Sequence, residues 1–227
     1  MIKSWLRPME QIILSARARN ARVLAFTGID KASGVDVLCE ELADALQKSG
    51  VDTLLMQLAT GAGDAAGASA GDWSPASLAT TKSITRHSKG FDFLKAGTSP
   101  DIQFRFNNLE LLKSAFNTDL AKYKAIIVAL PVVGRELGRQ INPVAVASAC
   151  DSVYLVCRTG GTSRQKVEDA VKQLRNGGVQ LSGTILDDAA VVTPASSILQ
   201  KLKRLERLAP RTKKRLERMV SGSELLN

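Results

Sequence analysis

Residues 22–50 read RVLAFTGIDKASGVDVLCEELADALQKSG, and this stretch divides into three segments. Residues 22–27 form an apolar run of strand length, residues 28–36 form a glycine-containing loop, and residues 37–50 form a helix that ends in glycine. A strand, a glycine-containing loop and a helix in this order are the setting that a phosphate-binding P-loop needs. The stretch therefore predicts an α/β fold with a P-loop-like turn.

The loop lacks the side chains that a working P-loop uses. A working loop reads GxxxxGK[ST], and Gly34 stands at the position of its last glycine. Val35 then replaces the lysine that neutralises the β- and γ-phosphates, and Asp36 replaces the hydroxyl that holds Mg²⁺. A carboxylate ~4 Å from one phosphate charge repels it by about 4 kcal/mol at an effective dielectric constant of roughly 20. The sequence thus predicts the scaffold of a nucleotide enzyme without its catalytic groups.

Strands and helices alternate through the remainder of the chain. Residues 60–77 are rich in Gly, Ala and Ser and are predicted to be a mobile loop. The alternation predicts a mostly parallel β-sheet flanked by helices on both faces, a three-layer αβα fold of the P-loop NTPase-like kind. The predicted strands are 51–58, 90–97, 124–130, 151–157 and 179–186, and the predicted helices are 106–123, 142–149 and 162–178.

Charge is concentrated at the two ends of the chain. Residues 1–22 have a net charge of +4 and residues 201–218 of +7, against +9 for the whole sequence. The middle of the chain is therefore nearly neutral, which indicates a polyanionic partner at the termini rather than a basic groove through the fold. We divide the chain into an N-terminal amphipathic basic segment at 1–20, a globular domain at 21–195 and a basic C-terminal helical tail at 196–227.

Several kinds of protein and site are disfavoured. No window is long and apolar enough to span a bilayer, and the N-terminus lacks a signal-peptide pattern, so we expect a cytoplasmic location. Cys39, Cys150 and Cys157 lie inside predicted elements without metal-ligand spacing, which favours buried hydrophobic roles. His87 lies in a polar segment without the partners of a catalytic triad, and we predict a surface residue. We expect neither a metal nor a cofactor.

Three later segments carry a resemblance to one protein family. They are GFDFLKAGTSPDIQFRFNNLELLKSAF from residue 90, YKAIIVALPVV from residue 123 and CDSVYLVCRTGGTSRQKVEDAVKQLRNGGVQLSGTILDD from residue 150. They resemble the bacterial tyrosine kinases (BY-kinases) of capsule and exopolysaccharide systems, which share a P-loop branch with partition and division-site ATPases. The resemblance runs from about Arg22 to Asp187 and implies that the globular domain is a degenerate P-loop kinase-like domain.

The departures from the family pattern are systematic. In the family, the second strand ends with two aspartates that help to place Mg²⁺, and Gln57 and Ala59 match them here. Ala129 matches the next metal-binding aspartate, and Asp187 matches an asparagine near the adenine. Together with the two altered loop positions, every catalytic position carried over from the family is changed. The resemblance therefore implies a pseudokinase with no catalytic residue.

Two further family features are missing. The family kinases carry a C-terminal tyrosine cluster as their own substrate, whereas this chain has only Tyr123 and Tyr154, in or beside predicted core strands. The family also has an ExxRxxR helix used for ring assembly, and Ile13 and Ala16 stand at its arginine positions. The sequence therefore leaves oligomerisation possible, but the motif that the family uses for ring assembly is absent.

The remaining candidate residues lie in the loop and at the two ends. Lys31 is either a phosphate contact from an unusual position or a solvated loop lysine, and the missing metal ligands favour the second interpretation. Trp5 beside basic residues suits a membrane interface or a partner helix equally well. The degenerate phosphate loop comprises Gly28, Lys31, Ser33, Gly34, Val35 and Asp36; the predicted membrane- or partner-binding residues are Trp5, Arg211, Lys213, Lys214, Arg215 and Arg218.

The resemblance implies a non-catalytic regulatory or scaffold subunit of bacterial exopolysaccharide or capsule synthesis and export. Its expected partner is the cytosolic part of an inner-membrane chain-length regulator, with an anionic membrane surface as a second partner at the inner face of the cytoplasmic membrane. One alternative is a divergent partition- or division-site-type ATPase that uses Lys31. Another is a salt-sensitive nucleic-acid binder, which the lack of stacking aromatic side chains in the tail disfavours.

Overall fold

The structure, a computed structural model, describes residues 6–30, 33–58, 73–75, 83–97, 99–134 and 141–187. The chain divides into two compact units, residues 1–187 and residues 188–227, and the described residues all belong to the first. The predicted C-terminal tail lies outside the described residues, so the division at 1–20, 21–195 and 196–227 stays a prediction.

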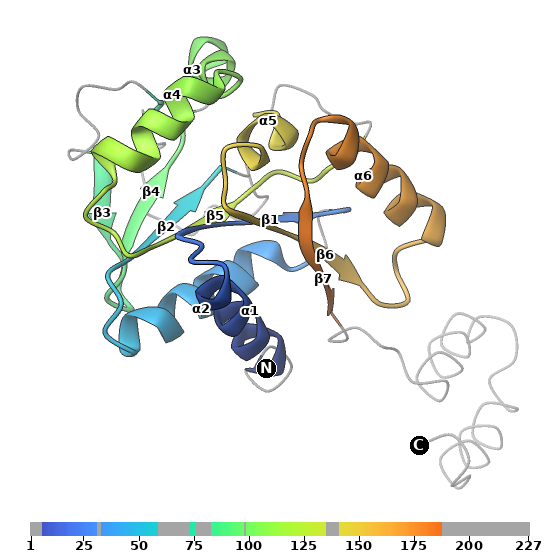
Figure 1. Ribbon diagram of the computed structural model, residues 1–227, viewed down its shortest axis with the longest axis horizontal. Coiled ribbons are helices and arrows are strands. Elements are labelled where there is room, and N and C mark those ends of the chain that lie inside the picture. Colours follow the sequence, from blue (N-terminus) through green and yellow to red (C-terminus); the bar gives the residue numbers. More distant parts are fainter. Residues whose placement is uncertain are drawn as a thin grey trace, which may run out of the picture. The chain divides into compact units, whose positions relative to one another are not determined.

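One mostly parallel sheet organises the described residues (Figure 1). Its seven strands have the order β3-β4-β2-β5-β1-β6-β7, and every neighbouring pair is parallel except β3 and β4. The predicted α/β class and the parallel sheet are therefore confirmed. The strands are β1 (Val23–Gly28), β2 (Thr53–Gln57), β3 (Ile84–Arg86), β4 (Asp92–Lys95), β5 (Ala125–Ala129), β6 (Ser152–Arg158) and β7 (Leu181–Asp187).

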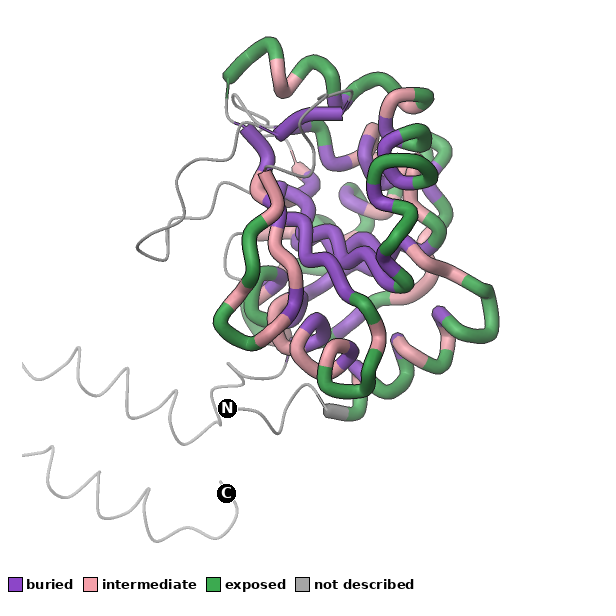
Figure 2. Tube along the Cα trace, turned by 90° about the vertical axis from the view of Figure 1, so that its left-hand side faces the viewer, coloured by how far each residue is buried: buried purple, intermediate pink, exposed green. Residues whose placement is uncertain are grey.

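Helices cover both faces of the sheet, which gives the predicted three layers (Figure 1). Successive side chains of β1 explain the arrangement: Val23 and Ala25 belong to one apolar cluster, whereas Leu24 and Phe26 belong to the other. The central strands are therefore buried along their length (Figure 2). On one face lie α1 (Leu6–Ala18) and α2 (Val35–Lys48); on the other lie α3 (Pro100–Arg105), α4 (Leu109–Ser114), α5 (Pro143–Ala147) and α6 (Arg164–Asn176).

The helix predicted at 106–123 is shorter than expected and is not uniform. It begins after Asn108, whose side chain caps α4, and it continues as a π-helical turn over Ala115–Asp119. The Arg22 guanidinium donates hydrogen bonds to carbonyl groups of and just after this turn, at 2.6 Å to Phe116 O and 3.2 Å to Leu120 O. The π-helical turn leaves some carbonyl groups without their usual helical donors. Arg22, the residue just before β1, supplies donors to two of the carbonyl groups in this region.

The prediction of a mobile loop at 60–77 is wrong for Trp73, Ser74 and Pro75, which are buried. Trp73 is fully buried, pairs as an isolated bridge with Ala96, and packs edge-on against Phe106 with ring centroids 5.6 Å apart. Burial of an indole group of this size stabilises the fold enough to offset the entropy lost in fixing these three residues.

The N-terminal segment packs on the sheet through part of its apolar face. Met9, Ile12 and Ala16 are 3–7% exposed and lie in the same apolar cluster as Leu24 and Phe26. The sequence pattern assigns Trp5 of this segment to a membrane interface or a partner helix. For these three residues, the surface that they contact is the chain's own core.

Candidate functional site

The predicted phosphate loop lies where β1 ends and α2 begins, at the carboxyl edge of the parallel sheet. Two of the altered metal positions are brought beside it. Gln57 ends β2 and Ala129 ends β5, and these two residues are directly paired across neighbouring strands. Ala129 is also paired with Phe26 of β1. The topology therefore gathers positions from three separate stretches of sequence, as it does in open α/β sheets that bind ligands at this edge.

Gly34 provides the backbone turn into α2. Its φ of 71° and ψ of 17° lie in the left-handed region, which glycine enters at no steric cost. No side chain caps this helix start, and the first intrahelical bond runs from Leu38 N to Gly34 O at 3.0 Å. Asp36 lies exposed in the first turn, where its negative charge favours the helix dipole. A left-handed glycine thus precedes α2, and a carboxylate stands at the position that the resemblance matches to a hydroxyl.

Ser33 forms hydrogen bonds within the loop itself. Ser33 is 2% exposed; its N–H donates to Asp30 O at 3.2 Å, and its hydroxyl donates to the same carbonyl. A β-carbon placed on Gly28 would lie 1.8 Å from Ser33 Oγ. Gly28 therefore has a steric role, because its missing side chain makes the space that the serine fills.

The two positions that the resemblance matches to the P-loop lysine and hydroxyl have contacts within the fold. Val35 is 8% exposed and belongs to the apolar cluster beneath α2, so its side chain packs on the core. Asp36 accepts a hydrogen bond from Gln57 Nε2 at 3.4 Å. Two positions that the resemblance matches to metal-binding residues therefore contact each other directly. Ala129 is 1% exposed, and it offers only a methyl group at the position that the resemblance matches to another metal-binding aspartate.

A second contact closes the loop from the side of β6. Thr162 donates its hydroxyl to Asp30 Oδ2 at 3.2 Å, which joins the β1–α2 loop to the β6–α6 loop. Burial, and then the charge of Asp30, raises the pKa of the nearby Cys157 thiol. The sequence analysis missed this contact. The available signal was that neighbouring parallel strands place their following loops at the same edge.

The position that the resemblance places near the adenine lies further along the same edge. Asp187 ends β7 and is 7% exposed, and its carbonyl accepts a hydrogen bond from Thr159 N at 3.0 Å. Within the described ranges, no three His, Cys, Asp or Glu side chains are placed together to hold a metal ion. The polar groups of the site are thus carboxylates, hydroxyls and one amide.

Both tyrosines are core residues, as predicted. Tyr123 is 3% exposed and donates its hydroxyl to Asp92 Oδ2 at 2.6 Å; burial, and then that hydrogen bond, raises the pKa of Tyr123. Tyr154 is 4% exposed and stacks on Phe26 with ring centroids 5.2 Å apart. Neither hydroxyl is placed for modification in the folded protein.

The cysteines and the histidine are placed as follows. Cys39, Cys150 and Cys157 are free, and burial raises the pKa of each thiol. His87 stacks on Phe91 with centroids 4.4 Å apart, and its side chain keeps 29% of its exposure. This histidine lies in the turn between β3 and β4, and its ring packs on another residue of that turn rather than extending freely into solvent.

Several predicted site residues lie outside the described part of the chain. They are Trp5, Lys31, Ala59, Arg211, Lys213, Lys214, Arg215 and Arg218. Their predicted roles stay predictions. No helix in the described ranges is long and apolar enough to cross a membrane.

Comparison with known proteins bears on the fold. No family model and no curated protein matches this sequence. Among solved structures, the kinase domain of the Escherichia coli tyrosine kinase ETK is similar at 18% identity and a TM-score of 0.66, with 79% of this chain and 72% of that chain covered. The BceF tyrosine kinase domain is similar at 23% identity and 0.62, with 82% and 81% covered.

A third similar structure comes from a cell division complex. It is the MinC:MinD cell division protein complex of Aquifex aeolicus, at 17% identity and a TM-score of 0.58, with 76% of this chain and 72% of that chain covered. At these identities the likeness concerns the fold. The resemblance to bacterial tyrosine-kinase domains and division ATPases is confirmed at that level, and the chain has a P-loop NTPase-like α/β fold.

Proposed function

We propose that this protein is a non-catalytic relative of the bacterial tyrosine kinases, acting as a regulatory or scaffold subunit in polysaccharide synthesis and export. One observation carries the proposal. The hydrogen bond between Asp36 and Gln57 joins two positions that would have to bind Mg²⁺ in an active kinase of this fold. At the second of these positions Gln57 presents an amide donor to Asp36, where the resemblance expects a carboxylate ligand.

The electrostatics of the loop support the same conclusion. An incoming triphosphate would meet the carboxylate of Asp36 without the lysine that neutralises it, because Val35 is packed in the core. Ala129 supplies no oxygen for a metal that could offset this repulsion. The loop keeps the backbone turn at Gly34, which supports a role in holding the scaffold.

Docking on a partner needs only shape and exposed side chains, so a protein of this kind can lose catalysis and keep a binding surface. We propose the cytosolic part of an inner-membrane chain-length regulator as the partner, which places the protein at the inner face of the cytoplasmic membrane. The basic ends of the chain, with +4 in residues 1–22 and +7 in residues 201–218, suit an anionic surface there.

Genetic complementation tests this proposal. In a host strain that lacks the protein, polysaccharide export is expected to be restored equally by the wild-type chain and by a Lys31→Ala variant, because no phosphate contact is needed. The matched control is Gly28→Ala, which disturbs the fold of the loop itself. Restoration by the wild type and not by Lys31→Ala would favour a divergent ATPase of the partition or division-site type.

A further inference from the structure

Helix α1 has two faces of different character. Met9, Ile12 and Ala16 point into the core at intervals of three and four residues. The opposite side is exposed and carries one large apolar side chain, Leu14, among small and polar residues. We call it the α1 ridge; its outermost line comprises Arg7, Gln11, Leu14 and Ala18, flanked by Glu10 and Arg17.

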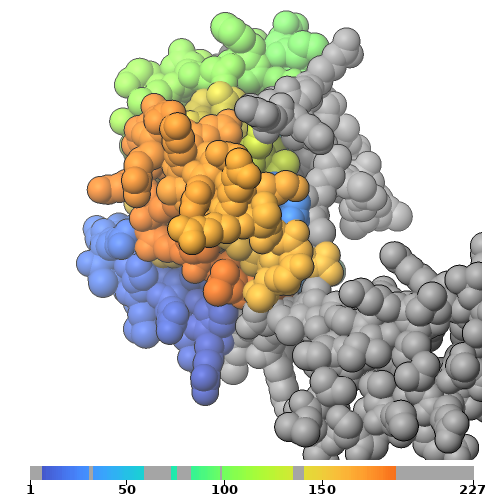
Figure 3. Space-filling view, turned by 90° about the vertical axis from the view of Figure 1, so that its right-hand side faces the viewer, coloured from blue at the N-terminus to red at the C-terminus, as the bar shows by residue number. Residues whose placement is uncertain are grey.

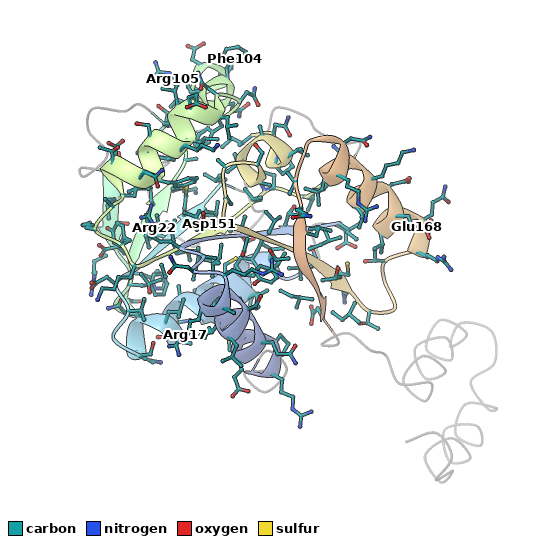
Figure 4. The ribbon with its side chains drawn as sticks, viewed as in Figure 1. Arg17, Arg22, Phe104, Arg105, Asp151 and Glu168 are labelled. Carbon is teal, nitrogen blue, oxygen red and sulfur yellow. The ribbon has the colours of Figure 1, made fainter. Side chains whose placement is uncertain are left out.

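Leu14 is the central residue of the α1 ridge and is 64% exposed. Large exposed hydrophobic side chains number four in the described part of the chain, and only Leu14 lies on a helix between two exposed arginines, Arg7 and Arg17. Figure 4 labels Arg17 on the face of the sheet that α1 and α2 cover, and Figure 3 shows the blue part of the described chain at the surface. Arg19 follows, fixed by a 2.8 Å hydrogen bond to Ser182 Oγ.

We propose that the α1 ridge lies flat on an anionic lipid surface. The guanidinium groups of Arg7 and Arg17 would contact lipid phosphates, and Leu14 would enter the boundary between headgroups and acyl chains. The charge is complementary: residues 7–19 carry three arginines against Glu10 alone. This inference rests on the proposed location beside the membrane, but not on the state of the phosphate loop.

The side chains of the ridge favour a lipid surface over a protein groove. A helix that binds in a protein groove presents several apolar anchors at intervals of three, four and seven residues. The α1 ridge offers one such anchor, Leu14, and its neighbours along the line are Arg7, Gln11 and Ala18. One leucine flanked by long basic side chains matches the shallow insertion of a membrane-surface helix.

Vesicle co-sedimentation of the full-length protein tests the proposal, with pure phosphatidylglycerol vesicles compared against pure phosphatidylcholine vesicles. Leu14→Gln is expected to weaken binding to phosphatidylglycerol about tenfold, the effect of keeping one leucine side chain in water. The matched control is Leu186→Gln, because Leu186 is 61% exposed on β7 and away from the ridge. The control is expected to bind as the wild type does.

The charge contribution has its own matched pair of variants. Arg7→Gln combined with Arg17→Gln is expected to weaken binding roughly thirtyfold, since each basic residue near an anionic leaflet changes the affinity about fivefold. Lys172→Gln combined with Arg175→Gln removes the same charge from the exposed side of α6 and is expected to have a smaller effect. All these side chains are exposed, so unchanged thermal melting will establish that each variant is folded.

Two results would overturn the proposal. Equal binding of Leu14→Gln and Leu186→Gln would mean that the ridge does not touch lipid. A change in the oligomeric state of Leu14→Gln without lipid, measured by light scattering, would assign the ridge to a protein contact instead. Nucleotide binding to the phosphate loop would refute the proposed pseudokinase and leave both vesicle comparisons unaffected.

Discussion

Replacing Gly28 with alanine is expected to destabilise the protein by about 2–4 kcal/mol. The added β-carbon would lie 1.8 Å from Ser33 Oγ and 2.9 Å from Ser33 Cβ, distances at which one side must move. Ser33 is 2% exposed and its hydroxyl is bonded to Asp30 O, so it has no free space to enter. The expected loss combines ~1–3 kcal/mol of overpacking with ~1 kcal/mol for a broken hydrogen bond.

Urea denaturation measures this loss as a lower midpoint at an unchanged slope. Gly183→Ala is the matched control, because its new β-carbon would make an ordinary 3.5 Å contact with the Tyr154 ring. Adding Ser33→Gly to Gly28→Ala removes the colliding atoms and is expected to restore most of the lost stability. If Gly28→Ala is no more destabilising than Gly183→Ala, the serine does not fill the loop and the reasoning fails.

Three more predictions concern the site and its surroundings. Val35→Lys, Asp36→Ser and Ala129→Asp together are expected to raise the affinity for Mg²⁺-ATP, measured by calorimetry, because Gly34 keeps the P-loop turn. Burial raises the pKa of Asp92, but hydrogen bonds from Tyr123 and Arg86 outweigh it and leave the folded-state pKa lowered. Asp92 therefore stabilises the fold above its unfolded pKa, and this contribution is lost as the pH falls through the folded value. Asp92→Asn is expected to flatten the acid side of a stability-against-pH curve, from about pH 5 downward. Incubation with labelled ATP is expected to give no phosphotyrosine by mass spectrometry, since both tyrosines are buried.

The fold could be predicted from the sequence because its central strands are buried on both faces. Such strands are continuous apolar runs, and β5 and β6 agree with the predicted segments to within one residue at each end. The edge strand β3 has only three residues, with the sequence Ile-Thr-Arg, and no pattern of that length separates a strand from a loop. It pairs with β4 only because the hairpin turn brings the two together.

Long-range contacts explain the other differences. The π-helical turn depends on Arg22, which lies 94 residues from Phe116, and no local pattern contains that partnership. The burial of Trp73 likewise depends on Phe106 and Ala96 from later elements. Tertiary contacts of this kind override local propensity, so the sequence alone favoured a single helix and a loop.

At the candidate site, the sequence predicted which positions would meet but not how they would interact. Asp36 and Gln57 were recognised as separate departures from one family pattern. Their hydrogen bond requires α2 and β2 to meet at the carboxyl edge of the sheet. The contact between Thr162 and Asp30 joins residues 132 positions apart and follows from β1 and β6 being neighbours.

Titration of Mg²⁺-ATP into the purified full-length protein tests the central claim most directly. Calorimetry is expected to show no saturable heat at millimolar nucleotide, and a parallel thermal melt is expected to show no stabilisation. Saturable binding would contradict the account, especially if it stabilised the fold by the ~2.7 kcal/mol that a hundredfold excess over the dissociation constant provides. In that case the bond between Asp36 and Gln57 would have to open for the nucleotide, and the protein would be a divergent ATPase rather than a scaffold.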